Sequence, residues 1–267
     1  MVSRFVKALY EEQGFFSPLQ VVSPQEAQQA RKELECAEEI LGPLHYQDKI
    51  HTVLTSAWKL ATHPTLLDAV EEVLGSDVLL YNVTYIVKEP GSLAHVAWHQ
   101  DLTYWGLSSD AQVSAWLALS PATQDSGCMT MVPGSHHQGK VEHQLADDET
   151  NVLYNGQHVS GVGEDAAVLC PLTLGEASLH HGWTLHASRP NTSNDRRIGL
   201  NMQFISPEVY QTLHGKDSAI LVRGVDRFNH FGKDEPASVD LDPQAIKTRA
   251  QKQAVVKGAY LAAREQE

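Results

Sequence analysis

The sequence lacks several features that would place it in a special class. Its three cysteines, Cys36, Cys128 and Cys170, lie far apart without a CxxC pair, which is typical of free thiols in a reducing compartment. No apolar run approaches the ~20 residues that a membrane helix needs. The first residues also lack the apolar core and cleavage site of a signal peptide. These absences predict a cytoplasmic protein with no membrane partner.

Basic side chains are also scarce. The chain has 20 Lys and Arg against 33 Asp and Glu, a net charge of -13. Such a chain repels polyphosphate on average, so we do not expect nucleic acid as a partner. Hydrophobic residues at 42% and charged residues at 20% are ordinary for a globular protein and exclude a disordered or fibrous chain. Histidine, in contrast, is plentiful, with 14 copies.

The apolar period changes along the chain. Ser23, Pro24 and Glu26 form the signature of a capped helix start, and a second helix is expected from Pro64 to the residue before Gly75. After residue 77 the period falls to about 2, which predicts strands. The expected strands cover residues 78–87, 93–98, 112–120, 129–132, 166–169, 177–181 and 197–205.

Short strands with turn residues and no helices between them favour an antiparallel barrel or a double-sheet jelly roll. We therefore expect a mainly β protein with flanking α-helices, folded as one domain over residues 1–267. Its parts are a helical N-terminal region over about 1–75, a β-core over about 77–206 and a C-terminal helical extension over about 207–267. The polar segment 142–165 is longer than an ordinary connection, which predicts a functional loop or lid.

One histidine lies where chemistry could use it. His99 and Asp101 are two residues apart, so on a strand an imidazole and a carboxylate would face the same side. A third ligand would complete the two-histidine, one-carboxylate triad of non-haem Fe(II) oxygenases. Spacing alone leaves His180, His181 and His186 open as that ligand, and each has an ordinary structural interpretation as a hydrogen-bonded histidine.

Four stretches in order resemble the phytanoyl-CoA dioxygenase family. They are His99-x-Asp101, then Ser114-Ala115-Trp116-Leu117-Ala118-Leu119, then Gly127-Cys128-Met129 with Val132-Pro133-Gly134-Ser135-His136, and finally His186-x-Ser188-x-x-Asn191-x-Ser193-x-x-x-Arg197. The resemblance runs from about Tyr81 to Ile205. It implies a double-stranded β-helix (jelly roll, cupin-like) core and an Fe(II)- and 2-oxoglutarate-dependent dioxygenase.

The resemblance also implies roles for individual residues. His99, Asp101 and His186 match the iron ligands, and Arg197 matches the arginine that holds the far carboxylate of the co-substrate 2-oxoglutarate. A planar guanidinium suits that task because it binds a carboxylate with two hydrogen bonds. Further contacts to 2-oxoglutarate are expected from Ser188, Gln100, Asn82, Thr84 and Trp116. Arg196 would point to the opposite side of the strand.

The implied reaction is hydroxylation of an unactivated C–H bond by dioxygen, with release of succinate and carbon dioxide. Some relatives halogenate and have a small residue in place of the carboxylate ligand, so the presence of Asp101 favours hydroxylation. Over residues 186–200 the sequence most resembles bacterial members of the family, which implies a small polar or zwitterionic substrate. Candidate substrate contacts are Tyr104, Trp105, Trp183 and the 142–165 segment.

Two other interpretations stay open at this point. A non-oxygenase metal protein, either a zinc hydrolase or a metal-binding barrel, would explain the histidines but not Arg197. A β-domain that binds a partner and has lost catalysis would not need intact ligands. The sequence gives no indication of the oligomeric state.

Overall fold

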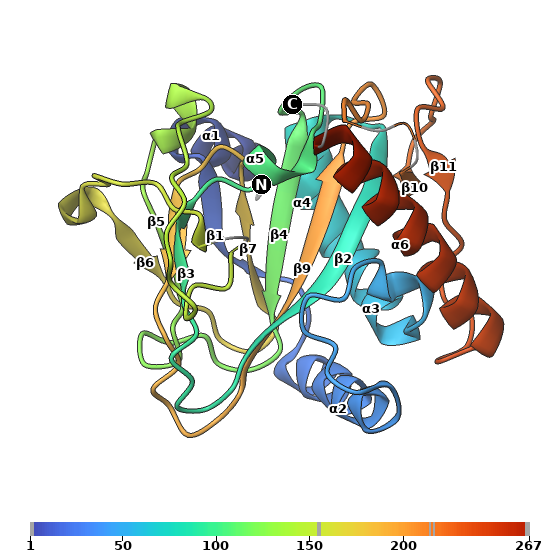
Figure 1. Ribbon diagram of the computed structural model, residues 1–267, viewed down its shortest axis with the longest axis horizontal. Helices are drawn as coiled ribbons and strands as arrows, with labels where there is room; N and C mark the ends of the chain where they lie inside the picture. Colours follow the sequence, from blue (N-terminus) through green and yellow to red (C-terminus); the bar gives the residue numbers. More distant parts are fainter. Residues whose placement is uncertain (1–2, 154–155, 214, 216, 265–267) are drawn as a thin grey trace.

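The computed structural model describes residues 3–153, 156–213, 215 and 217–264. These residues form two sheets that face each other (Figure 1). The larger sheet contains, in spatial order, β1 (Phe15–Gln20), β7 (Glu176–His180), β4 (Gln112–Ala118), β9 (Arg197–Ile205), β2 (Val78–Lys88), β10 (Ser218–Arg223) and β11 (Gly232–Lys233).

The smaller sheet contains, in spatial order, β3 (Val96–His99), β8 (His186–Ser188), β5 (Met129–Met131) and β6 (Val168–Cys170). Its strand pairs are antiparallel, as are those of the larger sheet apart from the parallel β10–β11 pair. This arrangement confirms the predicted jelly-roll core with flanking helices.

Side chains alternate across the larger sheet as the period of 2 requires. On β9, Ile198, Leu200, Met202 and Phe204 belong to the apolar core that includes the helices. Residues that alternate with them, Arg197, Asn201 and Gln203, instead line the cavity between the two sheets. The same alternation on β2 turns Asn82 and Thr84 toward that cavity. The inner face of the sheet is therefore polar because of the sequence pattern itself.

The helices are α1 (Ser3–Gln13), α2 (Pro24–Leu41), α3 (Thr55–Ala61), α4 (Pro64–Leu74), α5 (Leu102–Trp105) and α6 (Pro243–Arg264), with 3-10 turns η1 (Ile50–Thr52), η2 (Ser135–Gln138) and η4 (Glu164–Ala166). The predicted helices α2 and α4 are confirmed. The Ser23 side chain accepts from the Glu26 backbone N–H, and the Glu26 carboxylate accepts from that of Ser23.

The helices cover different sides of the larger sheet. In Figure 1, α4 and α3 lie behind it, while α6 runs across the open side of the fold beside β10. Apolar side chains of α2, α3 and α4 join the core against the outer face of the sheet. Because α6 contributes no fully buried residue among its described side chains, its inner face is free to form part of a cavity wall.

Four strands, β1, β8, β10 and β11, fall outside the predicted arrangement. The N-terminal region was expected to be helical, but it contains β1, which pairs with β7 at one edge of the larger sheet. The C-terminal region was also expected to be helical, but its β10 pairs with β2 and extends the sheet at the other end. β8 was not expected at all, although it supplies one of the predicted ligands. These strands are short or follow helical segments, so their local pattern gives little signal.

No described helix has both the length and the apolar character needed to cross a membrane. The three cysteines are free thiols; Cys128 and Cys170 are buried and Cys36 is exposed.

Candidate functional site

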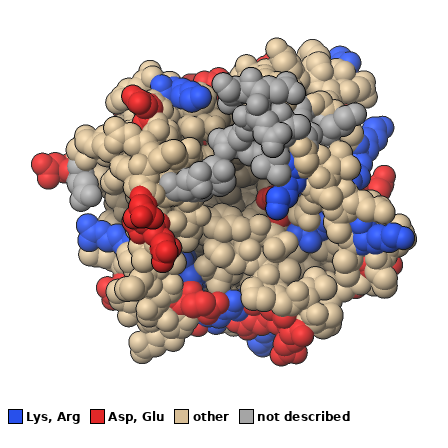
Figure 2. Space-filling view, in the orientation of Figure 1, with Lys and Arg blue, Asp and Glu red and all other residues tan. Residues whose placement is uncertain are grey.

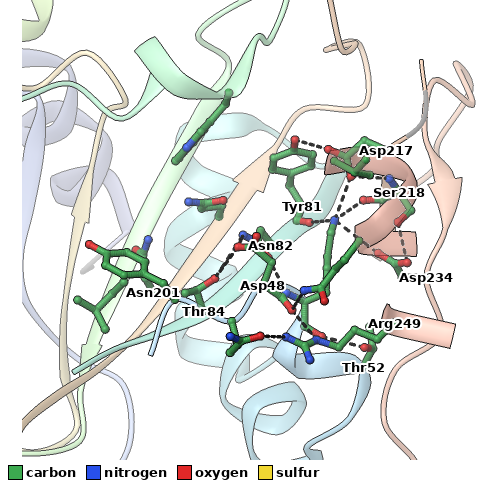
Figure 3. Close-up of a pocket in the computed structure, with 18 of the residues that line it drawn as sticks. Asp48, Thr52, Tyr81, Asn82, Thr84, Asn201, Asp217, Ser218, Asp234 and Arg249 are labelled. Atoms are coloured by element: carbon green, nitrogen blue, oxygen red, sulfur yellow. Dashed lines mark hydrogen bonds and ion pairs between the residues drawn. The ribbon is translucent and has the colours of Figure 1, made fainter. Parts of the chain in front are cut away.

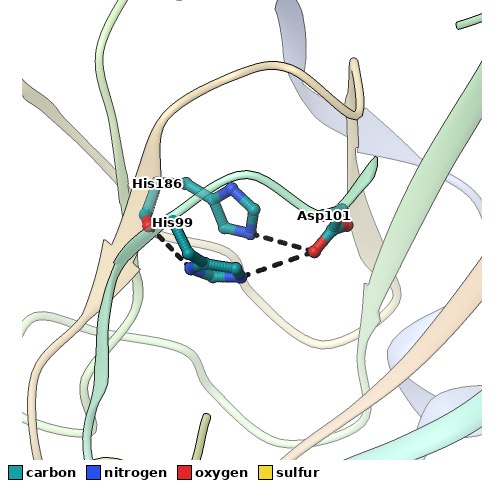
Figure 4. Close-up of side chains that lie close together, drawn as sticks. All are labelled: His99, Asp101 and His186. Atoms are coloured by element: carbon teal, nitrogen blue, oxygen red, sulfur yellow. Dashed lines mark hydrogen bonds and ion pairs between the residues drawn. The ribbon is translucent and has the colours of Figure 1, made fainter. Parts of the chain in front are cut away.

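The predicted histidine ligands come together because β3 and β8 are neighbours. His99 is the last residue of β3 and His186 is the first residue of β8, and the antiparallel register places them opposite each other. Asp101 follows two residues after His99, just before α5. The ligand atoms of these three side chains lie within 4.8 Å of one another (Figure 4). Geometry thus selects His186 from the three histidines that spacing left open.

Hydrogen bonds fix the orientation of both imidazoles. His186 Nδ1 lies 3.0 Å from the Thr184 carbonyl oxygen, and His99 Nδ1 lies 2.9 Å from that of Ala97 and 3.0 Å from that of His186. A carbonyl only accepts, so each Nδ1 must carry the hydrogen and each neutral ring presents the lone pair of Nε2. This is the arrangement in which histidine binds a metal ion.

The Asp101 carboxylate divides its two oxygens between two tasks. Oδ1 lies 3.4 Å from His99 Nε2 and 3.7 Å from His186 Nε2. Oδ2 accepts a hydrogen bond from Ser114 Oγ at 2.9 Å and lies 3.2 Å from His180 Nε2. Burial alone would raise the pKa of Asp101, but its contacts with the imidazoles of His180, His99 and His186 outweigh burial and hold that pKa well below its usual range. The carboxylate is therefore ionised, with Oδ1 left for a ligand.

The three ligand atoms need a cation between them. Burial, followed by the neighbouring His99, lowers the pKa of His186 to about 3, so this ring is neutral. The Nε2 atoms of His99 and His186 and the carboxylate oxygen of Asp101 then converge in a buried site with no anion-neutralising group of their own at the centre. A divalent metal ion supplies such a group, and two histidines with one carboxylate suit Fe(II) with open coordination positions. His180, in contact with Asp101, supports the site from outside.

Arg197 lies on the facing sheet in an unusual state. Its side chain is 1% exposed, and none of the described residues forms a hydrogen bond or ion pair with its guanidinium. The guanidinium lies over the Trp116 ring, 4.3 Å from the ring centroid. Burial lowers the pKa of Arg197 to about 10, so it remains charged at neutral pH. A buried cation without an anion is costly, and the fit for a carboxylate ligand is therefore good.

Gly199 makes room for the Trp116 indole below that guanidinium. A Cβ on Gly199 would lie 1.8 Å from Trp116 Cζ2, so any side chain at this position would displace the ring. Trp116 lines the cavity as predicted. The absence of a side chain at one position of β9 thus fixes the environment of Arg197 two residues earlier.

Lys88 is a buried cation that the sequence did not single out. It lies opposite Arg197 in the β2–β9 register, and its Nζ donates to the Ser188 carbonyl at 3.1 Å, to Ser188 Oγ at 2.7 Å and to the Arg189 carbonyl at 2.6 Å. Because Ser188 Oγ accepts from Lys88, its own hydrogen is free to donate to a ligand. Burial, followed by the charge of Arg197, lowers the pKa of Lys88 to about 7.

The remaining predicted contacts divide into two groups. Asn82 and Thr84 line the cavity, but their side chains donate to Asp48 Oδ1, at 2.8 and 3.1 Å. The prediction for Gln100 is not supported. Its side chain is fully buried and outside the cavity lining, and it uses its amide on the backbone of Gly139, Val141 and Trp183. It holds two loops together and has no group directed at a co-substrate.

A cavity of about 1070 Å³ connects these features. Figure 2 shows a hollow in the middle of one face of the molecule, and Figure 3 shows polar side chains that line the part of the cavity near α6. Tyr104 and Trp105 contribute to the lining, as do Val152 and Leu153 of the predicted loop, whereas Trp183 does not. The volume exceeds what a five-carbon co-substrate fills, so room is left for a substrate.

Comparisons with known proteins agree with this geometry. The family model described as Phytanoyl-CoA dioxygenase (PhyH) matches residues 10–199. The 1-deoxypentalenic acid 11-beta-hydroxylase of Streptomyces arenae is 33% identical over 51% of this chain and 51% of its own. A probable alpha-ketoglutarate-dependent hypophosphite dioxygenase of Stutzerimonas stutzeri is 25% identical over 65% of this chain and 63% of its own. The chain thus spans about half to three-fifths of the length of these relatives.

A solved structure is similar over a larger part of the chain. The non-heme monooxygenase ThoJ in its apo form is 29% identical, covers 98% of this chain and 100% of its own, and has a TM-score of 0.87. Its nickel complex gives a TM-score of 0.80. Since the family model matches more than half of the residues, the chain belongs to the phytanoyl-CoA dioxygenase family.

Proposed function

We propose that this protein is an Fe(II)- and 2-oxoglutarate-dependent dioxygenase that hydroxylates a C–H bond of a small polar or zwitterionic molecule and releases succinate and carbon dioxide. One observation carries the proposal: three metal-ligand atoms within 4.8 Å of one another face a buried guanidinium that has no partner among the described residues. A metal site and a carboxylate site in one cavity fit a co-substrate that needs both.

The residues of this chain would divide the work as follows. His99, Asp101 and His186 would hold Fe(II), which with 2-oxoglutarate supplies the oxygen-activating chemistry when bound. Arg197 would bind the far carboxylate with two hydrogen bonds, and Ser188, oriented by Lys88, would donate a third. Trp116 would form the apolar wall beside them. Tyr104 and Trp105 would close the cavity over the metal side.

The direct test is succinate formation. Purified protein with Fe(II), ascorbate, oxygen and 2-oxoglutarate is expected to release succinate slowly without a substrate, because such enzymes turn over uncoupled. His186→Ala should abolish this activity and the visible absorption of the Fe(II)–2-oxoglutarate complex measured without oxygen. Lack of both signals in the wild-type protein would refute the proposal.

A zinc hydrolase or metal-binding barrel is less well supported. Three protein ligands with an open position also occur in catalytic zinc sites. That alternative gives no role to Arg197, a buried cation in the lining of the same cavity that has no carboxylate partner among the described residues. Saturable binding of 2-oxoglutarate that depends on Arg197 would separate the two.

A further inference from the structure

The cavity continues beyond the metal ligands over a polar floor. This floor is made by the inward-facing residues of β2 and β9 and by the segment before η1; Figure 3 shows how they line one wall below α6. The members are Asp48, Asn82, Thr84, Asn201 and Gln203. Gln203 is paired in register with Ser114, and Ser114 donates to the Asp101 ligand. The floor therefore begins next to the metal site.

Two amides of this floor lack a protein partner. Gln203 is only 8% exposed, and its side chain makes no hydrogen bond within the described part of the chain. Asn201 Oδ1 is buried and also has no hydrogen-bond partner among those residues. Buried amide groups are nearly always paired in folded proteins. Asn201 Oδ1 is such an exception, and the Gln203 amide two residues along the same strand is also unpaired within the described chain, so both are available to a ligand in the cavity.

Asp48 differs from Asp217 and Asp234, two other carboxylates of the cavity, in its charge balance. Asp217 and Asp234 each lie 3.5 Å from Lys49 Nζ, and Lys252 lies 2.8 Å from Asp234. Asp48 receives only neutral donors, Asn82 and Thr84, and both bind Oδ1. No Lys or Arg within the described ranges forms an ion pair with it. Asp48 is exposed at the side of the cavity, and the nearby Arg249 interacts with its charge without forming an ion pair with the carboxylate.

The nearest cation is occupied elsewhere. Arg249 of α6 donates from Nε to the Asp48 backbone carbonyl at 2.6 Å and from Nη2 to the Gln47 side chain at 3.3 Å. It thereby holds the backbone of residue 48 in place and leaves the carboxylate of that residue unpaired. Gln253 donates to the same carbonyl at 2.9 Å. Helix α6 therefore fixes the position of Asp48.

We propose that Asp48, Gln203 and Asn201 form a subsite that binds a protonated amine of the substrate. Asn82 and Thr84, which hold Asp48, lie directly opposite Gln203 and Asn201 in the β2–β9 register, where side chains are about 5 Å apart. The three residues offer three acceptor oxygens, which match the three N–H donors of an ammonium group. An anionic group would be repelled by Asp48. This inference rests on the proposed function and names its substrate class.

The test compares charged and neutral versions of the same molecules. The panel consists of primary amines of increasing length, each paired with its N-acetyl derivative, which keeps the skeleton and loses the charge. Three proteins are compared: wild type, Asp48→Asn and, as a control, Glu235→Gln, which removes an exposed carboxylate from the lining of the same cavity. Calorimetric binding and stimulation of succinate release are measured for each pair.

Wild type should bind amines in preference to their acetylated partners, and the best amines should accelerate succinate release. Asp48→Asn should lower binding and kcat/KM for these amines by about 10- to 100-fold, which corresponds to the loss of a hydrogen bond to a charged group. Glu235→Gln should retain the preference. The substrate-free succinate rate of Glu235→Gln should equal that of wild type.

Equal binding of amines and their acetylated partners, or a preference that survives in Asp48→Asn, would overturn the subsite. Because calorimetry does not need turnover, this result can be recognised even if the protein forms no succinate. Absence of succinate with a preserved, Asp48-dependent preference for amines would instead refute the proposed oxygenase and leave the amine subsite supported.

Discussion

Replacement of Arg197 by methionine should have opposite effects on folding and on co-substrate binding. Methionine has a similar length and no charge, and it can fill the space above Trp116. Arg197 is buried without a partner among the described residues, so its charge costs free energy in the protein without ligand. The same charge should contribute most of the affinity for the far carboxylate of 2-oxoglutarate. Few substitutions separate stability and binding as clearly.

The stability change can be bounded from the structure. Replacing a buried charged group by an apolar one of similar volume often stabilises by about 1–4 kcal/mol. Loss of the contact with the Trp116 ring, at 4.3 Å, offsets about 2 kcal/mol of this gain. The free energy of unfolding without ligand should therefore stay within about 2 kcal/mol of wild type. For a chain of this size, a change of 1 kcal/mol in the free energy of unfolding shifts the Tm by roughly 2–4 °C, so the Tm should change by only a few degrees.

The binding change should be much larger. Removing one partner of a buried, hydrogen-bonded charge pair costs about 2–5 kcal/mol. The Kd for 2-oxoglutarate should therefore increase by a factor of between about 30 and a few thousand. The measurement is thermal unfolding with Mn(II), with and without 2-oxoglutarate, followed by calorimetric titration. Mn(II) binding itself should change little, because Arg197 is not a metal ligand.

Arg196 provides a matched control. Its guanidinium lies 2.8 Å from Glu38 and 2.9 Å from Glu89, so this neighbouring arginine is already paired. Arg196→Met should lower stability by up to about 1 kcal/mol and leave 2-oxoglutarate binding unchanged. A large loss of stability in Arg197→Met would show that Arg197 holds the fold together. An unchanged Kd would show that another cation binds the co-substrate.

Three further outcomes follow from the same geometry. Gly199→Ala should place a Cβ against the Trp116 indole and so lower the free energy of unfolding, measured with urea, by about 1–3 kcal/mol. The displaced ring should also weaken 2-oxoglutarate binding, and an unchanged Kd would mean that the position of the ring is unimportant. Lys88 should make that binding pH-dependent. A bound carboxylate raises the Lys88 pKa from its value near 7, so binding above pH 7 takes up a proton. The Kd for 2-oxoglutarate should therefore rise by up to about tenfold per pH unit above pH 7, and Lys88→Met should remove this rise. A Kd that does not change with pH in the wild-type protein would contradict the prediction. Ser114→Ala should weaken metal binding by about 10- to 100-fold in a competitive Mn(II) titration, since Asp101 Oδ2 loses a donor; unchanged affinity would show that His180 suffices.

The sequence was most informative where one period persisted over many residues. The predicted strand 197–205 agrees with β9, because its apolar residues alternate over the full length and face a helical core. β8 has only three residues, too few to establish a period, and it was not predicted. β1 and β10 form through pairing with distant strands, which the local pattern does not encode.

The site shows the same division. Spacing could not choose among the three histidines, because the choice depends on which strand pairs with β3. Lys88 follows directly after the predicted strand, where a charged residue usually indicates solvent; it is buried only because β8 and the segment after it pack over it. Asp48 lies in an irregular segment between residues of positive φ, Tyr46 and Lys49, where no periodic signal exists.

The two sheets contribute different halves of the site, and side-chain bridges keep the halves in register. The predicted histidine ligands belong to the smaller sheet, whereas Arg197 belongs to the larger one. Asp101 follows the smaller sheet but is held by Ser114 of the larger one. Lys88 of the larger sheet holds Ser188 of the smaller one in return. The first bridge ends on Asp101, a predicted metal ligand, and the second ends on Ser188, next to the predicted carboxylate site. A change in the packing of the two sheets should therefore alter metal binding and co-substrate binding together.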